Sequence, residues 1–208
     1  MESKFINKPL RGQNFLDIEL SNRVFKDVID VLNENDVHYF LDYGTLLGFV
    51  REGEFVKRDF DIDITILSNS FSDLKKIYNT LKQLDKKGLR FGRAFLKHNG
   101  IDILRKANII VNDKNGNFTK LELSIGYIVK DKIYKVTGVE GGELFGAPTP
   151  ADMIDLITVW WKDRYVKIPK NPEVALEYHY GDWKTPRDDI SSTYKKPFEK
   201  INIRNKKS

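Results

Sequence analysis

Three aspartates at every second position are the residues of this sequence best suited to do chemistry. Asp59, Asp61 and Asp63 alternate with apolar residues as far as Ile66, which predicts a strand over residues 59–66. Alternate strand residues face one way, so the three carboxylates share a face with about 6.6 Å between successive Cα atoms. Like charges at this spacing favour a divalent counter-ion, and hard oxygen ligands favour Mg²⁺ or Mn²⁺, with two ions expected.

A Gly-Thr turn precedes this strand. Gly44 and Thr45 follow a short apolar run at residues 37–41, and Asp61 stands sixteen residues beyond the threonine. A glycine permits close backbone approach, and a threonine followed by the free amides of a new helix offers donors to phosphate oxygens. A phosphate site beside a metal site is the arrangement used for phosphoryl or nucleotidyl transfer.

Hydrophobic periodicity predicts the elements that position these residues. Residues 14–36 repeat apolar side chains at intervals of three and four, which indicates an amphipathic helix, and residues 37–41 are expected to form a strand. After the acidic strand, Ser70 and Asp73 are typical of a helix start, and Gly88 is typical of its end.

The middle of the chain is expected to be an antiparallel meander. The period changes to two, and turn signals occur at Asn99-Gly100, Asn115-Gly116 and Asp131-Lys132. The first two are predicted to be type I′ hairpin turns. The predicted strands are 91–97, 101–104, 109–111 and 118–129.

The last third is expected to be helical. Thr149-Pro150 supplies an N-cap and a proline at the first helical position, and apolar residues from Met153 to Tyr165 recur at helical spacing. A short helix over residues 173–180 should end at Gly181. The expected fold class is α+β: a mixed sheet with an antiparallel meander, packed by helices, with a helical C-terminal segment.

Composition excludes several classes of function. The chain of 208 residues has no cysteine, which excludes disulfide frameworks, thiolate metal sites and thiol nucleophiles. Residues 195–208 carry the whole formal net charge of +5, so the remainder lacks the positive field that nucleic-acid binding requires. We expect one domain over residues 1–194, a flexible basic tail over 195–208 that contacts anionic membrane weakly, and no nucleic-acid partner.

No apolar run has the length of a signal peptide or a membrane span. The expected location is therefore cytoplasmic, with the basic tail able to hold the protein at the inner face of the membrane.

Two stretches together resemble a known family. Residues 44–64, GTLLGFVREGEFVKRDFDIDI, are similar without a gap to the signature G-T-L-L-G-x-x-R-x-x-x-F-I-P-W-D-D-D-I-D-I of the LicD/fukutin-related family. Residues 180–186, YGDWKTP, resemble its closing Y-G-x-W-x-x-P element. The resemblance covers residues 35–190 and implies a nucleotidyltransferase fold.

The resemblance also implies a reaction. Members of that family move a phosphorylated alcohol, such as phosphocholine or an alditol phosphate, from a CDP-linked donor onto a glycan or lipid-linked glycan, using Mg²⁺ or Mn²⁺. Asp61 and Asp63 then look like metal ligands, Gly44 and Thr45 like the phosphate turn, and Arg51 like a cation that faces the donor diphosphate. The implied biological setting is the decoration of cell-surface polysaccharide.

The sequence departs from the family pattern at three positions. Lys57 and Arg58 replace the usual Pro-Trp pair, which leaves donor and acceptor preference open. Phe60 replaces the middle acid and leaves the alternating aspartates in place.

A third carboxylate is expected from a neighbouring strand. Asp102 lies in a short apolar-Asp-apolar-apolar run that resembles the family's next strand, and we prefer it as the third metal ligand and catalytic carboxylate. Glu122, in the alternating run 120–125, is the alternative. Trp183 is expected either to stack on the base or sugar of the donor or to cap the core. The three histidines show no ligand spacing and are expected not to bind metal.

Two rival functions share these residues. The same turn and acids would serve an NTP-dependent nucleotidyltransferase that acts on a small molecule. An inactive copy of the fold that serves as a binding subunit is the other alternative.

Overall fold

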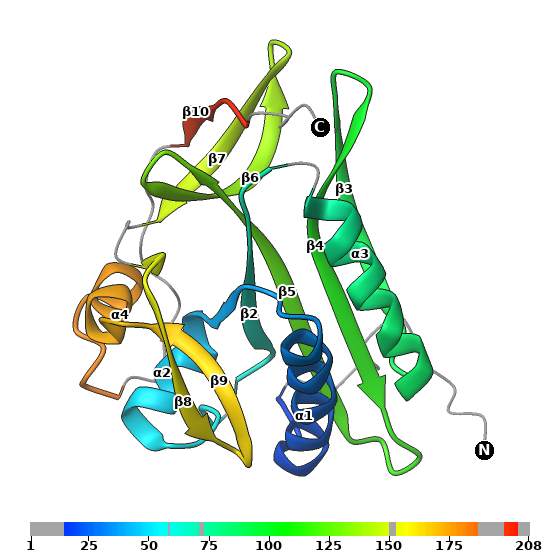
Figure 1. The fold of residues 1–208 in the computed structure, drawn as a ribbon. Coiled ribbons are helices and arrows are strands. Elements are labelled where there is room, and N and C mark those ends of the chain that lie inside the picture. Colours follow the sequence, from blue (N-terminus) through cyan, green and yellow to red (C-terminus); the bar gives the residue numbers. More distant parts are fainter. Residues whose placement is uncertain (1–14, 58, 71–72, 150–152, 187–197, 204–208) are drawn as a thin grey trace.

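The computed structural model describes residues 15–57, 59–70, 73–149, 153–186 and 198–203 (Figure 1). In this part of the chain, an eight-stranded mixed sheet runs through the molecule, and a two-stranded hairpin forms a second sheet beside it.

The long strand β5 (Phe118–Val129) organises the main sheet. It pairs in parallel with β2 (Ile62–Ser68), and antiparallel with β4 (Ile101–Asn112) at its start and with β6 (Lys132–Glu140) at its end. The predicted mixed sheet with an antiparallel meander is therefore confirmed. The outer strands are β1 (Tyr39–Leu41) beside β2, β3 (Phe91–His98) beside β4, and β7 (Glu143–Thr149) and β10 (Glu199–Ile201) beyond β6.

Helix α1 (Ile18–Glu34) packs against β5 with its predicted apolar face. Asp17 caps its start by accepting a hydrogen bond from the amide of Leu20 at 2.7 Å. The hydroxyl groups of Ser21 and Thr119 share a buried 2.7 Å hydrogen bond, which fixes the helix on the strand.

The other helices begin and end at local signals. The Asp73 carboxylate accepts hydrogen bonds from the amides of Asn69 and Ser70, and Gly88 ends the segment at a φ of 75°. The predicted start and stop are confirmed. The remaining helices are α2 (Tyr43–Glu52), α3 (Asp73–Leu81), the 3₁₀ segment η1 (Lys82–Lys87) and α4 (Pro172–Tyr180).

The turns of the meander differ in kind. Asn99 and Gly100 both have positive φ, as a type I′ turn requires. At Asn115-Gly116 the loop is longer, because the Asp113 carboxylate accepts hydrogen bonds from the backbone of Asn115 and Asn117. The prediction of a second two-residue turn is therefore wrong, and the two short strands predicted before it are one strand, β4.

The helix predicted over Met153 to Tyr165 is wrong. The chain forms a hairpin of β8 (Leu156–Trp161) and β9 (Arg164–Pro169), which turns at Lys162 and Asp163 with φ of 50° and 59°. The strand-forming run of β-branched and aromatic residues in β8 outweighs the helical spacing. Pro150 lies outside the described residues.

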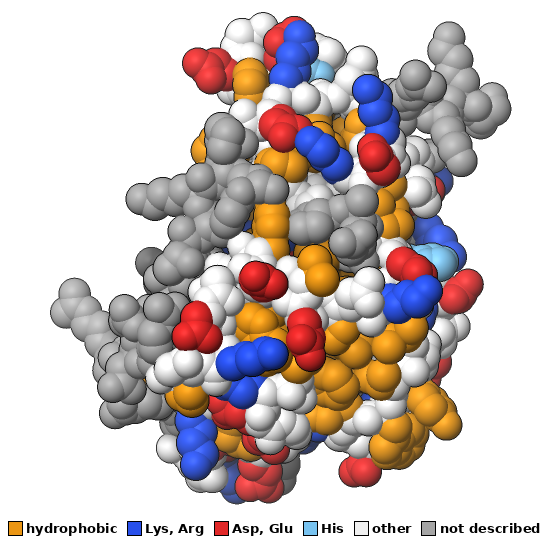
Figure 2. Space-filling view, turned by 90° about the vertical axis from the view of Figure 1, so that its left-hand side faces the viewer, with side chains coloured by type: hydrophobic (Ala, Val, Ile, Leu, Met, Phe, Trp, Pro, Cys, Tyr) orange, Lys and Arg blue, Asp and Glu red, His pale blue; other side chains and the backbone are white. Residues whose placement is uncertain are grey.

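Trp161 anchors this hairpin to the rest of the fold. Its ring packs edge-on against Phe25 and Phe55, with centroids 5.4 and 5.3 Å away, and its indole donates to the carbonyl of Gly53 at 2.9 Å. Trp160 and Tyr165 are exposed on the same hairpin, and their ring centroids lie 4.9 Å apart. Figure 2 shows hydrophobic side chains gathered on one face of the molecule.

Part of the predicted flexible tail is structured. Residues 199–201 pair with β7, and the side chains of Ile201 and Ile203 are buried in the core. Glu199 accepts a 2.7 Å hydrogen bond from the Tyr134 hydroxyl. The expectation of a solvated tail is wrong for residues 198–203; residues 195–197 and 204–208 lie outside the described residues.

Among the helices of the described residues, none combines the length and apolar character that crossing a bilayer needs.

Candidate active site

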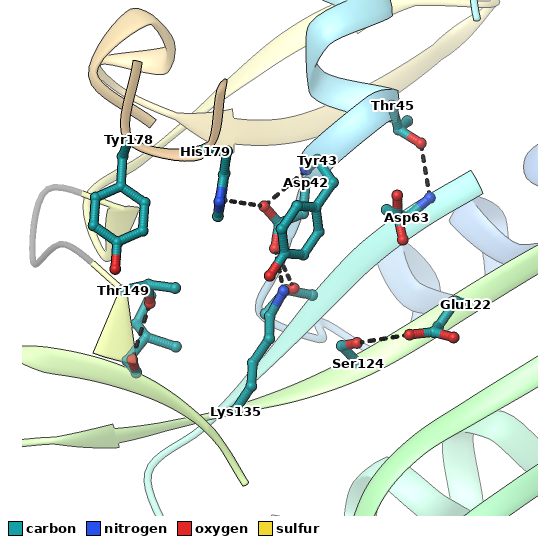
Figure 3. A network of polar contacts seen from close by, with 12 residues as sticks. Asp42, Tyr43, Thr45, Asp63, Glu122, Ser124, Lys135, Thr149, Tyr178 and His179 are labelled. Atoms are coloured by element: carbon teal, nitrogen blue, oxygen red, sulfur yellow. Dashed lines mark hydrogen bonds and ion pairs between the residues drawn. The ribbon is translucent and has the colours of Figure 1, made fainter. Parts of the chain in front are cut away.

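Asp59, Asp61 and Asp63, called the rim acids below, lie where β2 begins and beside the first turn of α2. The strand starts at Ile62, so only Asp63 lies within it, and Asp59 and Asp61 belong to the segment that leads into it. The amide of Asp63 donates to the buried Thr45 hydroxyl at 2.7 Å (Figure 3). Behind this face Ile62 is buried, as the alternation predicted.

The environment of Asp59 and Asp63 opposes their ionisation. Burial, together with the charges of Asp61, Asp42 and Asp59, holds the pKa of Asp63 well above its usual value. Burial also raises the pKa of Asp59 to about 6, with the charge of Asp61 adding to the effect. Among the described residues, no hydrogen bond or ion pair reaches the carboxylate of Asp63, and the more distant charge of Lys135 only partly offsets the rise of its pKa.

Strand β5 places Glu122 and Lys120 beside the rim acids, because the parallel register sets Asp63 opposite Glu122. The Lys120 ammonium forms an ion pair with Asp61 and lies 3.7 Å from Glu122. Lys106 on β4 binds the same Glu122 oxygen at 2.8 Å. Burial opposes ionisation of Glu122, but the hydrogen bond and charge of Lys106 and the charge of Lys120 hold its pKa below the usual value.

The Gly-Thr pair lies in the first turn of α2. A Cβ on Gly44 would lie 2.2 Å from Oδ2 of Asp59, so only glycine leaves room for that carboxylate. The helix begins at Tyr43, two residues before the predicted start at Thr45, and its N-terminal cap is the Asp42 carboxylate. Gly44 and Thr45 therefore position rim acids in this structure; their predicted contact with phosphate stays a prediction.

A second carboxylate, absent from the sequence predictions, lies beneath this turn. Asp42 is 0% exposed, and its Oδ2 accepts hydrogen bonds from Lys135 at 2.6 Å and from Thr65 at 2.7 Å (Figure 3). The His179 Nε2 lies 3.2 Å from Oδ1. Although burial opposes ionisation, the charge of Lys135 and the contact with His179 lower the pKa of Asp42.

The aromatic ring of Tyr43 packs against Lys135 and His179, the two partners of Asp42. Its centroid lies 4.0 Å from the Lys135 ammonium and 4.3 Å from the centroid of the His179 ring. Tyr43 has a φ of 39°, an unusual conformation for a residue with a side chain. His179 thus binds the buried acid rather than the rim acids.

Arg51 and Trp183 join the two family-like stretches. Arg51 forms an ion pair with Glu52 and donates to the backbone carbonyl of Trp183 at 3.2 Å. Trp183 is only 8% exposed and packs in the hydrophobic core. Of its two predicted roles, the structure supports the core cap, and it gives Arg51 a contact that holds the 181–186 segment against α2.

Asp102 lies elsewhere. It is exposed on β4, where it pairs with Lys97 of β3. The β4 residue that pairs with Glu122 is Asn108, six residues further along the strand. It lines a separate cleft of about 320 Å³ with Tyr78 and other side chains of α3 and β3. The preference for Asp102 as third carboxylate is not supported by this placement, and Glu122 is the acid that the sheet brings to the rim acids.

The carboxylates of Asp61 and Asp63 are the groups of this corner that could bind a divalent cation. Among the described residues, no three Asp, Glu or His side chains converge as a complete metal site. Asp63 nevertheless offers carboxylate oxygens without a protein partner in a strongly acidic environment, and Asp61 lies two residues away. These residues fit a hard cation that binds with further ligands from substrate or water.

Comparison with known families matches residues 36–171, well over half of the chain, to the LicD/FKTN/FKRP nucleotidyltransferase domain. The chain belongs to this family. The matched range contains the Gly-Thr pair, the rim acids and Glu122, whereas the 180–186 stretch lies beyond it. Family membership establishes the nucleotidyltransferase fold of the matched range.

The individual relatives are more distant. An uncharacterized protein of Rickettsia typhi is 33% identical over 82 residues, which are 39% of this chain and 24% of that protein, so the match spans about a quarter of its length. The antibiotic-resistance factor ANT(2'')-Ia is 12% identical, with 85% of this chain and 79% of that one covered and a TM-score of 0.44.

A nucleotidyltransferase-like antigenic protein of Paracoccidioides brasiliensis is 13% identical, with 74% of this chain and 62% of that one covered and a TM-score of 0.39.

Proposed function

We propose that this protein is a metal-dependent phosphotransferase that moves a phosphorylated alcohol from a CDP-linked donor onto a glycan or lipid-linked glycan acceptor. Family membership supports the transferase class. The observation that carries the proposal is the acidic corner where β2 meets α2: Asp61 and Asp63 present carboxylates there, and no ion pair or hydrogen bond among the described residues reaches the carboxylate of Asp63.

In the proposed reaction, Asp61 and Asp63 hold the cation, Mg²⁺ or Mn²⁺. When bound, the ion neutralises the diphosphate of the donor and makes its phosphorus easier to attack. Thr45 keeps Asp63 in place through the backbone hydrogen bond, and Gly44 leaves space for Asp59. These contacts hold the ligands before substrate arrives, so little reorganisation is needed at the moment of transfer.

The transfer itself is an in-line displacement. The acceptor hydroxyl oxygen forms a bond to the phosphorus that carries the alcohol, and the phosphoanhydride bond to CMP breaks. CMP leaves with that electron pair, and the hydroxyl proton is released to solvent. Catalysis of this kind comes mostly from positioning and charge neutralisation.

Aromatic side chains beside the rim acids are suited to hold the donor. Phe60 is 56% exposed and Phe15 is 45% exposed, and their ring centroids lie 5.3 Å apart. The amide of Leu16 donates to the carbonyl of Asp59 at 2.8 Å, which fixes this pair next to the acids. An exposed ring in this position provides a stacking surface for a base or sugar, a role that the buried Trp183 does not fill.

The proposal is tested first by ligand binding. Melting temperatures are measured with CDP-choline, CDP-glycerol, CDP-ribitol and the four nucleoside triphosphates, each with and without Mg²⁺. A ligand at about 100 times its Kd adds about 2.7 kcal/mol of stability, which is easily measured. We expect a metal-dependent shift with a CDP-linked compound.

Release of CMP in the presence of a glycan acceptor then tests transfer. Pyrophosphate release from a nucleoside triphosphate would instead support the nucleotidyltransferase alternative. Absence of any metal-dependent ligand shift would support an inactive binding subunit.

A further inference from the structure

Lys120 lies where a second cation would be expected among the acids. It is on β5, with Glu122 and Ser124 on the same strand face, and its ammonium binds Asp61 and lies 3.7 Å from Glu122. Its side chain is 28% exposed. Its ammonium therefore lies between two carboxylates, where it supplies positive charge to both.

The oxygens of Glu122 are already bound by protein groups. Oε2 contacts Lys106 at 2.8 Å and Lys120 at 3.7 Å, and Oε1 accepts a hydrogen bond from Ser124 at 3.4 Å. Asp61 uses Oδ2 for Lys120. A metal ion shared by Asp61 and Glu122 would have to displace the lysine.

Asp63 is in the opposite situation. Its carboxylate has no hydrogen bond or ion pair among the described residues. The corner therefore has two halves: the carboxylates of Asp61 and Glu122 are bound by lysines, whereas the carboxylate of Asp63 is left for a ligand.

We infer that Lys120 takes the place of the second metal ion, so that the site binds a single divalent cation at Asp63. The inference rests on the proposed function and replaces the two ions expected from the sequence. A fixed ammonium supplies positive charge beside the donor phosphates at any metal concentration. Lys120 contacts one carboxylate oxygen of Asp61, so the other oxygen would be able to help Asp63 hold the ion.

Counting bound ions tests this directly. Mn²⁺ is titrated into the full chain without nucleotide, and the free ion is measured by its electron paramagnetic resonance signal. We expect one Mn²⁺ per chain for the unmodified protein and two for Lys120→Gln, in which Asp61 and Glu122 lose their shared cation. Lys120→Arg keeps the charge and should still bind one ion.

A matched control removes a lysine of the same sheet that pairs with an acid away from the corner. Lys132 lies 3.2 Å from Glu199, and Lys132→Gln should bind one Mn²⁺. Melting curves establish that each variant is folded, and Lys120→Met serves if Lys120→Gln is not.

The outcomes separate the two proposals. Two ions in the unmodified protein, or one in both neutral Lys120 variants, overturn the inference and leave a metal-dependent enzyme in place. No ion in any variant overturns the inference and also removes the metal-dependent function on which it rests.

Discussion

Asp42 and Asp63 are neighbours in this fold, since the amide of Asp42 donates to the carbonyl of Asp63 at 3.1 Å, but the surroundings of their side chains are opposite. Asp42 is fully buried and satisfied: Lys135, Thr65 and the amide of Tyr43 all donate to it. Asp63, twenty-one residues later, is reached by no such donor among the described residues, and its pKa moves upward instead of downward.

The difference indicates which acid stabilises the fold and which one does chemistry. A buried carboxylate surrounded by donors has no capacity left for a ligand, and removing it leaves its partners unpaired. A carboxylate that lacks counter-charge destabilises the free protein, and such groups are found where a ligand supplies the missing charge. The corner thus contains a structural acid, Asp42, beneath the acids that we propose to bind the cation.

The largest effect is expected at Asp63. Asp63→Asn removes the charge at nearly constant volume, so CMP release should fall at least about 10³-fold, equivalent to about 4 kcal/mol of transition-state stabilisation. The melting temperature of the metal-free protein should stay the same or rise, because repulsion among the rim acids is relieved. Steady-state kinetics and melting curves measure both quantities, and full activity in this variant would contradict the proposed mechanism.

Asp42→Asn should mainly lower the stability of the protein, whereas Asp63→Asn should mainly lower its activity. It leaves the Lys135 ammonium buried without its partner, which typically costs about 3 to 5 kcal/mol of unfolding free energy. Urea denaturation measures this loss. If the variant were as stable as the unmodified protein but inactive, Asp42 would belong to the functional acids and the comparison would fail.

Asp42 also determines part of the pH dependence of stability. Its folded pKa is lowered, so the unfolded chain binds its proton first as the pH falls. The contribution is fully present above the unfolded pKa of about 3.9 and is lost as the pH decreases below it. Between pH 5 and 2, the free energy of unfolding should therefore fall more steeply with decreasing pH for the unmodified protein than for Asp42→Asn. Equal pH dependence of the two proteins would contradict this assignment.

Local sequence was sufficient for the residues of the corner that are close in the chain. The Gly-Thr pair and the alternating aspartates lie within twenty residues, so spacing alone placed them together, and the structure joins them through Thr45 and Asp63. Lys120, Lys135 and His179 come from three distant elements. Their positions depend on strand register and helix packing, which periodicity does not encode.

Strand register also explains the choice between Asp102 and Glu122. Both lie in short alternating runs, and only the pairing of β2 with β5 places Glu122 opposite Asp63. The β8–β9 hairpin was missed for a different reason: Lys162 and Asp163 adopt positive φ without the glycine or asparagine that usually marks such a turn.

The two candidate third carboxylates should therefore respond differently to substitution. Glu122→Gln removes the ion pairs of Glu122 with Lys120 and Lys106. We expect the rate of CMP release to fall about tenfold, which corresponds to about 1.4 kcal/mol of transition-state stabilisation. Asp102→Asn, on the exposed part of β4, should leave kcat and KM unchanged. A larger loss from Asp102 than from Glu122 would show that the β4 cleft takes part in the reaction.

An effect on KM alone is expected at the aromatic pair beside the rim acids. Stacking on an exposed aromatic ring is worth about 1 to 3 kcal/mol per base, so Phe60→Ala should raise the KM for the CDP-linked donor about tenfold. Because Phe60 is 56% exposed, its loss leaves no cavity, and the melting temperature should change little. Phe95→Ala is the matched control, since Phe95 is 47% exposed on β3 and lines the cleft that contains Asp102. Equal KM changes in the two variants would show that exposed rings affect the enzyme without specific donor contact, whereas a change confined to Phe60 places the donor over the rim acids.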